Sequence, residues 1–192
     1  MKQKTLGKKA TIAALALELA ICSPVSAAET DNISQMLSDK DRMHWLFPNG
    51  IPTKPSQMDH YLKEINVTVN TEDGTEEMTL LVHKKLASEV EDIFDELLSV
   101  EDFYINTDEC YSYNWREMAS GSGRLSHHSY GVCIDLNSTA NPPVYWDEEP
   151  DIESSYYCSD DVVEIFKDHG FYWGGDWSEK YYDPMHFTFT DH

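Results

Sequence analysis

Two stretches of the chain carry apolar residues at helical spacing. Between Lys84 and Val100 they recur every three or four positions, and acidic residues occupy the opposite side. The same spacing returns between Asp161 and His169, where Gly170 follows as a stop signal. The pattern therefore predicts two amphipathic helices, each with one face toward a core.

Four shorter stretches are rich in β-branched and other apolar residues, as strands are. Leu62–Val69 and Met78–His83 flank an Asp-Gly dipeptide, which predicts a hairpin at the edge of the main sheet. Val132–Leu136 and His186–Phe189 predict two further short strands. Because strands and helices follow no regular βαβ order, we expect an α+β fold: a single domain with a small antiparallel sheet and helices packed around it.

The first 27 residues have the features of a secretory signal peptide. Lysines come first, an apolar run follows from Ala10 to Ile21, and Val25-Ser26-Ala27 places small residues at the cleavage positions. We therefore expect export to the periplasm, the cell wall or the medium. The remaining chain divides into an N-terminal arm or helix at residues 28–60, with helical spacing over 31–47, and a main domain at residues 61–192.

The charge of the chain narrows the range of partners. Removing residues 1–27 takes away four lysines and one glutamate, which leaves ten basic and 34 acidic residues and a formal charge of −24. Such a surface repels nucleic acid and anionic lipid, so we expect neither as a partner, and no membrane association once the signal is cleaved. We expect a monomer.

Three cysteines remain in the trimmed chain. Cys133 lies inside a short apolar stretch, where a cysteine usually packs as a small hydrophobic residue. An oxidising compartment permits one disulfide among the three. The expected bridge therefore joins Cys110 to Cys158.

Two short motifs carry the candidate chemistry: Ser126 to Asp135, and Asp183 to Phe187. Together they supply imidazoles and carboxylates, which are zinc ligands, and a zinc site with three protein ligands and one open position is hydrolytic. Gly131 lets the backbone turn sharply, so that the preceding loop can fold back toward the strand bearing Asp135. His127 competes with its neighbour His128 for a ligand role.

At this point the residues resemble a known family. S-x-H-x-x-G-x-[AC]-x-D, followed by W-G-G-D-W and D-P-M-H-F, is similar to the zinc D-alanyl-D-alanine carboxypeptidases and L-alanyl-D-glutamate endopeptidases of the bacterial cell wall, in their VanY-like branch. The resemblance implies a zinc-peptidase fold acting on peptidoglycan peptides. It implies Zn²⁺ ligands at His128, Asp135 and His186, and a catalytic base at Asp183. It further implies that Arg116 stabilises the developing oxyanion, and that Ser126 hydrogen-bonds the substrate.

Several alternatives stay open. Cys133 stands where this family usually has alanine, and its thiol could pack or coordinate; a coordinating thiol would weaken the assignment of Asp135. Trp177 could line a substrate groove or pack in the core. The bond cleaved could be the terminal D-alanyl-D-alanine bond or the L-alanyl-D-glutamate bond. The rival from another class is a secreted wall-binding module that keeps the fold without catalysis.

Overall fold

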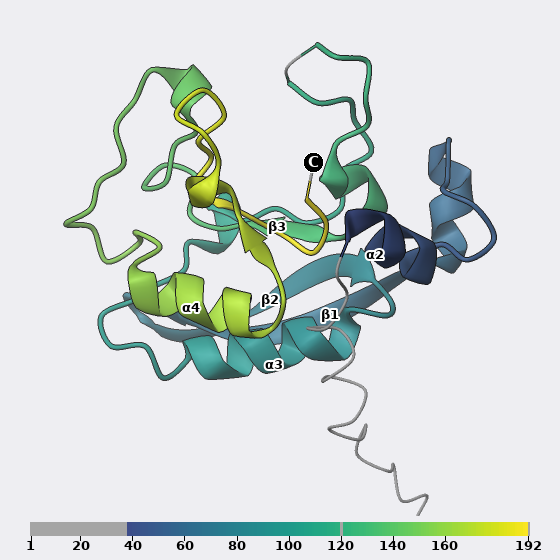
Figure 1. The fold of residues 1–192 in the computed structure, drawn as a ribbon. Helices are drawn as coiled ribbons and strands as arrows, with labels where there is room; N and C mark the ends of the chain where they lie inside the picture. The colour runs from purple at the N-terminus through teal and green to yellow at the C-terminus, as the bar shows by residue number, and fades with distance from the viewer. Residues whose placement is uncertain (1–37, 120, 192) are drawn as a thin grey trace, which may run out of the picture.

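The computed structural model describes residues 38–119 and 121–191. The expected signal peptide, with the start of the arm, lies outside these residues. The helices and strands, in chain order, are α2 (Asp39–Leu46), η1 (Pro55–His60), β1 (Leu62–Thr71), β2 (Gly74–His83), α3 (Ala87–Leu97), η2 (Thr107–Glu109), η3 (His127–Tyr130), β3 (Cys133–Asp135), η4 (Val144–Trp146), α4 (Asp160–Asp168), β4 (Tyr172–Trp173), η5 (Gly174–Asp176) and β5 (His186–Thr188). Figure 1 shows most of these elements in place. No helix among the described residues is long and apolar enough to cross a membrane.

The fold is α+β, as the sequence predicts, but it contains two small antiparallel sheets rather than one. The hairpin β1–β2 forms a sheet by itself, and β3, β5 and β4 form a second sheet with β5 in the centre. The hairpin is therefore not the edge of the main sheet, contrary to our expectation. Its end instead meets the second sheet through the loop before β3, where the His83 amide donates to the Gly131 carbonyl at 2.7 Å.

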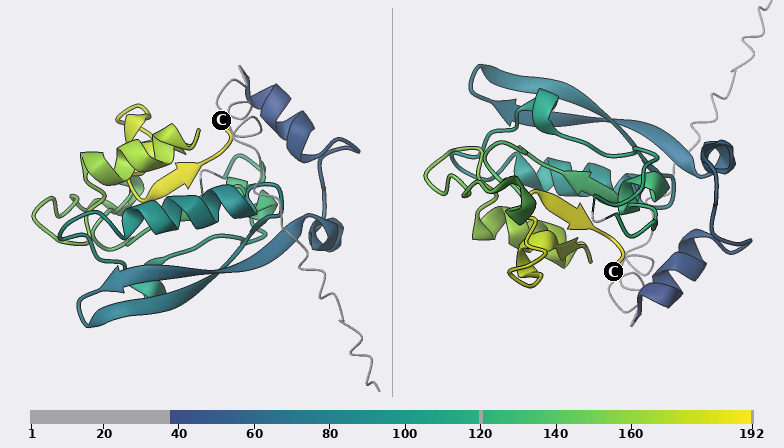
Figure 2. Two further views of the ribbon diagram at one scale, coloured as in Figure 1. Left: turned by 90° about the horizontal axis from the view of Figure 1, so that it is seen from below. Right: turned by 90° about the horizontal axis from the view of Figure 1, so that it is seen from above.

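The hairpin and α3 pack together because their apolar faces match. Alternate residues of β1 are buried, among them Ile65 and Val67, and the helical stripe of α3 that contains Ile93 and Phe94 is buried as well. Figure 2 shows α3 running between the hairpin on one side and α4 with β5 on the other. The core is thus continuous across both sheets.

The second sheet is covered by α4, and stacked rings hold the two together. The Phe166 ring lies nearly parallel to the Phe187 ring of β5, with centroids 4.0 Å apart. Phe187 is fully buried, so its neighbours on either side along β5 face away from α4. That opposite face carries His186 and the candidate chemistry.

The N-terminal helix is part of the same core. Leu46 and Phe47, at the end of α2, and Met58 of η1 are all buried within it. The buried guanidinium of Arg42 donates to the carbonyls of Gly170 (2.5 Å) and Phe189 (2.7 Å). Helix α2 is therefore fixed to the C-terminal part of the chain.

Candidate metal centre

The pairing of β3 with β5 sets two site residues opposite each other. Asp135 pairs with His186 in the antiparallel register, so their side chains emerge side by side from one face. The Nδ1 atom of His186 lies 2.7 Å from Oδ1 of Asp135. Both residues are buried, which places the contact at the floor of the site rather than on its rim.

The short helix η3 delivers His128 to the same carboxylate. The hydroxyl of Ser126 accepts the His128 amide at 3.4 Å, so Ser126 caps η3 at its N-terminus. Gly131 ends η3 with φ at 63°, and a Cβ there would lie 2.7 Å from a Leu62 methyl and 3.0 Å from the His83 nitrogen. Only glycine fits this return, and it brings Nε2 of His128 to 2.9 Å from Oδ2 of Asp135.

The orientation of the His128 ring suits a metal ligand. Its Nδ1 lies 2.5 Å from the backbone carbonyl of Ser112, which can only accept, so Nδ1 carries the proton. Once the ring is neutral, the lone pair therefore sits on Nε2, as it does in histidines that ligate a metal through Nε2 and donate a hydrogen bond from Nδ1. This Nε2 is buried and, despite its short distance to Asp135, has no hydrogen-bond partner among the described residues. An ion at this point would satisfy it.

Cys133 lies beside the same two imidazoles. Ligand atoms of His128, Cys133 and His186 all lie within 4.8 Å of one another. Because strand side chains alternate, Cys133 and Asp135 point to the same side of β3, as the sequence predicts. The structure therefore offers the two histidines a carboxylate and a thiol as further ligands, and the donor set fits zinc with either.

Charge coupling is strong within the cluster. Burial by itself would raise the pKa of Asp135, but the adjacent His128 and His186 outweigh it and hold that pKa well below its usual value. Burial lowers the pKa of His128, whereas Cys133 and Asp135 together raise it to about 11. Burial also raises the pKa of Cys133, so the thiol is neutral near pH 7 when no metal is bound. The negative charge that attracts a protonated His128 is therefore that of Asp135. A metal must displace the His128 proton, which makes its affinity depend on pH.

Asp183 stands at the edge of this cluster on a turn held by glycine. The Asp183 amide donates to the Gly174 carbonyl at 3.1 Å, and a Cβ on Gly174 would lie only 2.3 Å from the Asp183 carbonyl oxygen. Burial, partly offset by His186, raises the pKa of Asp183 from 3.8 to about 6. Its Oδ1 is buried with no hydrogen-bond partner in the described chain. A carboxylate with a pKa near the working pH is suited to move protons.

Arg116 is a cation within electrostatic range of the cluster. Its backbone is fixed to η3 by Ser129, whose hydroxyl accepts the Arg116 amide at 2.9 Å and donates to its carbonyl at 2.8 Å. The guanidinium is exposed, and its charge reaches the site, because it offsets a small part of the rise that burial gives to the pKa of Asp183 and of Cys133. Arg116 is thus a cation near the cluster without an ion pair to another described side chain.

Two aromatic neighbours border His186. The Trp177 ring lies 5.4 Å from the His186 ring, so this tryptophan is a wall of the site rather than a core residue. His127, the rival ligand, lies on another side of His186, with ring centroids 5.9 Å apart, and its Nδ1 is 3.1 Å from the Thr188 hydroxyl. The cluster with Asp135 is formed by His128 and His186.

Three contributors escape sequence reasoning. The Ser112 carbonyl fixes the His128 ring, but a backbone group leaves no signal in residue type. Ser129 is fully buried, and its place inside the first motif is the one signal in the sequence that could have pointed to it. Tyr145 is 60% exposed, and its pKa rises to about 12 through burial and then through Asp183 and Asp135; given that exposure, we favour the two carboxylates as the cause. Its phenol therefore lies within electrostatic range of the site.

The expected disulfide is not formed in the structure. Cys110 and Cys158 are both free thiols, and Sγ of Cys110 donates instead to the Asn106 carbonyl at 3.3 Å. The two thiols are nevertheless close enough for Cys110 to raise the pKa of Cys158 beyond the effect of burial. The bridge stays a prediction, since it depends on the redox compartment.

Comparison with known proteins connects this geometry to a family. Residues 120–189 match the family model described as D-alanyl-D-alanine carboxypeptidase, within peptidase family M15. No curated protein and no solved structure matched the chain. The matched segment contains the residues of η3, β3 and β5 that surround Asp135, together with the Asp183 turn. Over this segment, which is about a third of the chain, the sequence is similar to the M15 peptidases.

Proposed function

We propose that this protein is an exported zinc peptidase that hydrolyses an amide bond in the stem or cross-link peptides of peptidoglycan. The observation that carries the proposal is the convergence of His128 and His186 on the Asp135 carboxylate, with the partly buried Asp183 beside them. A zinc ion held by these three residues would supply Lewis-acid polarisation of the scissile carbonyl.

The other steps fall to the protein's own side chains. Asp183, with its raised pKa, takes a proton from the attacking water and returns it to the departing amine. Arg116 stabilises negative charge on the carbonyl oxygen, because it is a cation close to Asp183 with no carboxylate of its own. Trp177, which borders His186, and Tyr145, which lies within electrostatic range of Asp183, would contact the bound peptide.

The export component rests on the signal-like residues 1–27, and the substrate component rests on the family match. Two bonds are candidates, the terminal D-alanyl-D-alanine bond and the L-alanyl-D-glutamate bond. The test is incubation of the purified mature protein with defined muropeptides, with and without a chelator, followed by mass spectrometry. Metal-dependent loss of D-alanine, or metal-dependent release after L-alanine, supports the proposal and identifies the bond.

One observation favours a second candidate, a zinc-binding module without hydrolytic activity. The Cys133 thiol lies within 4.8 Å of the ligand atoms of both histidines, so it could act as a fourth ligand and close the coordination sphere. A zinc with four protein ligands is typical of structural sites. Bound zinc together with intact muropeptides would support this candidate over the peptidase.

A further inference from the structure

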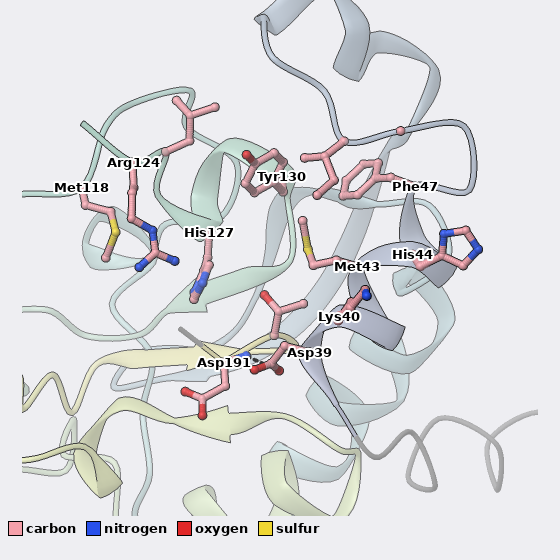
Figure 3. A pocket seen from close by; sticks show the side chains of 14 residues that line it. Asp39, Lys40, Met43, His44, Phe47, Met118, Arg124, His127, Tyr130 and Asp191 are labelled. Carbon is pink, nitrogen blue, oxygen red and sulfur yellow. Dashed lines mark hydrogen bonds between the residues drawn. The ribbon is translucent and has the colours of Figure 1, made fainter. Parts of the chain in front are cut away.

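A cavity lies between α2, residues 118 and 124–125, η3 and residues 190–191, and we call it the α2 pocket. Its volume is about 630 Å³, within the range of ligand sites. Figure 3 shows Met43 and Phe47 from α2 on one side and Arg124 with His127 on the other. Most of its lining residues lie outside the segment that the family model matches.

The α2 pocket adjoins the metal centre through His127. His127 lines the pocket and also lies against the ring of His186. Thr190, a second lining residue, is four positions beyond His186 in the chain. At about 3.4 Å per residue of extended chain, Thr190 lies within about 14 Å of the metal ligand His186. A substrate peptide that leads from the metal centre toward Thr190 covers up to this distance with three or four residues.

The lining of the α2 pocket suits an anionic group on an apolar stem. The side chains of Met43, Phe47 and Leu125 supply apolar walls. Arg124 points into the same space as Met118 and His127, and its guanidinium makes no ion pair or hydrogen bond with any other described residue. In a chain of net charge −21, a cation left without a partner in a cavity is a strong candidate for binding an anion.

Two further polar observations refine this picture. Thr190 is 1% exposed, yet its hydroxyl has no hydrogen-bond partner in the described part of the chain. Buried hydroxyls are normally paired, so this one is available to a ligand after a side-chain rotation. On the lower side of the pocket, Oδ1 of Asp39 already accepts the amide of Asp191 at 2.7 Å. In Figure 3 these two carboxylates lie below Arg124, and neither forms an ion pair with its guanidinium.

We propose that the α2 pocket is a substrate subsite, which binds a carboxylate-bearing residue of the peptide three or four positions from the scissile bond. This inference rests on the proposed peptidase function. It narrows the substrate class to peptides that are long enough to reach Arg124, because a shorter peptide loses one anchoring ion pair. A stem pentapeptide offers such a group for either bond: the D-glutamyl α-carboxylate for D-alanyl-D-alanine cleavage, and the terminal carboxylate for L-alanyl-D-glutamate cleavage.

The test is a binding cycle on zinc-loaded Asp183→Asn protein, in which turnover does not interfere. The probes are L-alanyl-γ-D-glutamyl-L-lysyl-D-alanyl-D-alanine, the same peptide amidated at the D-glutamyl α-carboxylate, and the same peptide amidated at its C-terminus. Calorimetry gives Kd for each in the starting protein, in Arg124→Gln and in Lys63→Gln. Lys63 is a matched control, since it is an exposed cation on the hairpin, outside the pocket, and it pairs with Glu91 of α3.

The expected result is that amidation of one carboxylate weakens binding about tenfold in the starting protein and in Lys63→Gln, and less than twofold in Arg124→Gln. Met43→Trp, which fills the pocket from the α2 side, should likewise abolish the difference, and thermal melts verify that each variant is folded. Equal discrimination in Arg124→Gln and the starting protein overturns the subsite. Failure of the wild-type protein to cleave the pentapeptide refutes the peptidase instead, so the two failures are distinguishable.

Discussion

Replacing Asp183 with asparagine should make the metal-free protein more stable and the loaded enzyme inactive. Burial raises the pKa of this carboxyl from 3.8 to about 6 in the folded chain. A raised folded-state pKa means that the stabilising contribution is complete below pH 3.8 and is lost as pH rises through about 6. Above that pH the folded state bears the cost of an ionised buried carboxylate, which a neutral asparagine side chain would avoid.

The magnitude follows from the pKa difference. At about 1.4 kcal/mol for each tenfold change, a pKa moved from 3.8 to about 6 costs about 3 kcal/mol at pH 8. At pH 5 roughly half of this cost remains. Asp183→Asn should therefore stabilise the metal-free protein by about 2–3 kcal/mol at pH 8 and by about half as much at pH 5. It should also lower kcat by about 100-fold or more.

Urea denaturation of the chelator-treated protein at both pH values measures the effect. The control is Asp73→Asn, in the exposed β1–β2 turn, where Asn-Gly suits a hairpin as well as Asp-Gly does. This control should change stability little and equally at both pH values. An Asp183→Asn protein that is less stable at pH 8, or equally stabilised at both pH values, would refute the buried-base reasoning.

Three further predictions concern other parts of the molecule. Hydrogen bonding to Glu89 outweighs the opposing effect of burial and raises the pKa of His169 above 6.5 in the folded protein. The contribution of protonated His169 to the free energy of unfolding is therefore present at low pH and is lost as pH rises through this raised pKa. His169→Gln should cost about 1 kcal/mol at pH 5.5 and less at pH 9, measured by urea titration. Cys133→Ala should keep zinc affinity within about tenfold, whereas Asp135→Ala should lose about 100-fold or more, measured by competition with a chromophoric chelator. Arg42→Ala should lower the free energy of unfolding by about 3 kcal/mol, because two carbonyls lose a buried donor.

Each of these has a contrary outcome. A pH-independent loss in the His169 variant would mean that packing, not charge, joins α3 to α4. Loss of zinc in Cys133→Ala would move the thiol into the ligand set and favour the non-catalytic module. An Arg42→Ala protein of unchanged stability would show that α2 is held by its apolar face alone.

Sequence reasoning succeeds where one local pattern determines one element. The hairpin turn, the stripe of α3 and the helix that precedes Gly170 are each visible in consecutive residues, and the structure contains all three. It fails on the relation between sheets, because the junction of His83 with Gly131 is a single backbone contact that no residue pattern encodes.

The candidate site shows the same division. The two motifs predict His128, Asp135 and His186 as site residues, and in the structure these three side chains lie around one point. The supporting groups were missed because they act through backbone atoms, as Ser112 does, or through a distant loop, as Tyr145 does. The two sheets must be assembled before such partners can be identified.

The close approach of Gly174 to the Asp183 carbonyl means that the reach of the proposed base is determined by main-chain packing rather than by its own side chain. Any larger residue at position 174 would displace the carboxylate without touching a reacting group. Attempts to retune this centre for other substrates should therefore conserve Gly174 and vary side chains such as Tyr145, whose replacement leaves this main-chain contact in place.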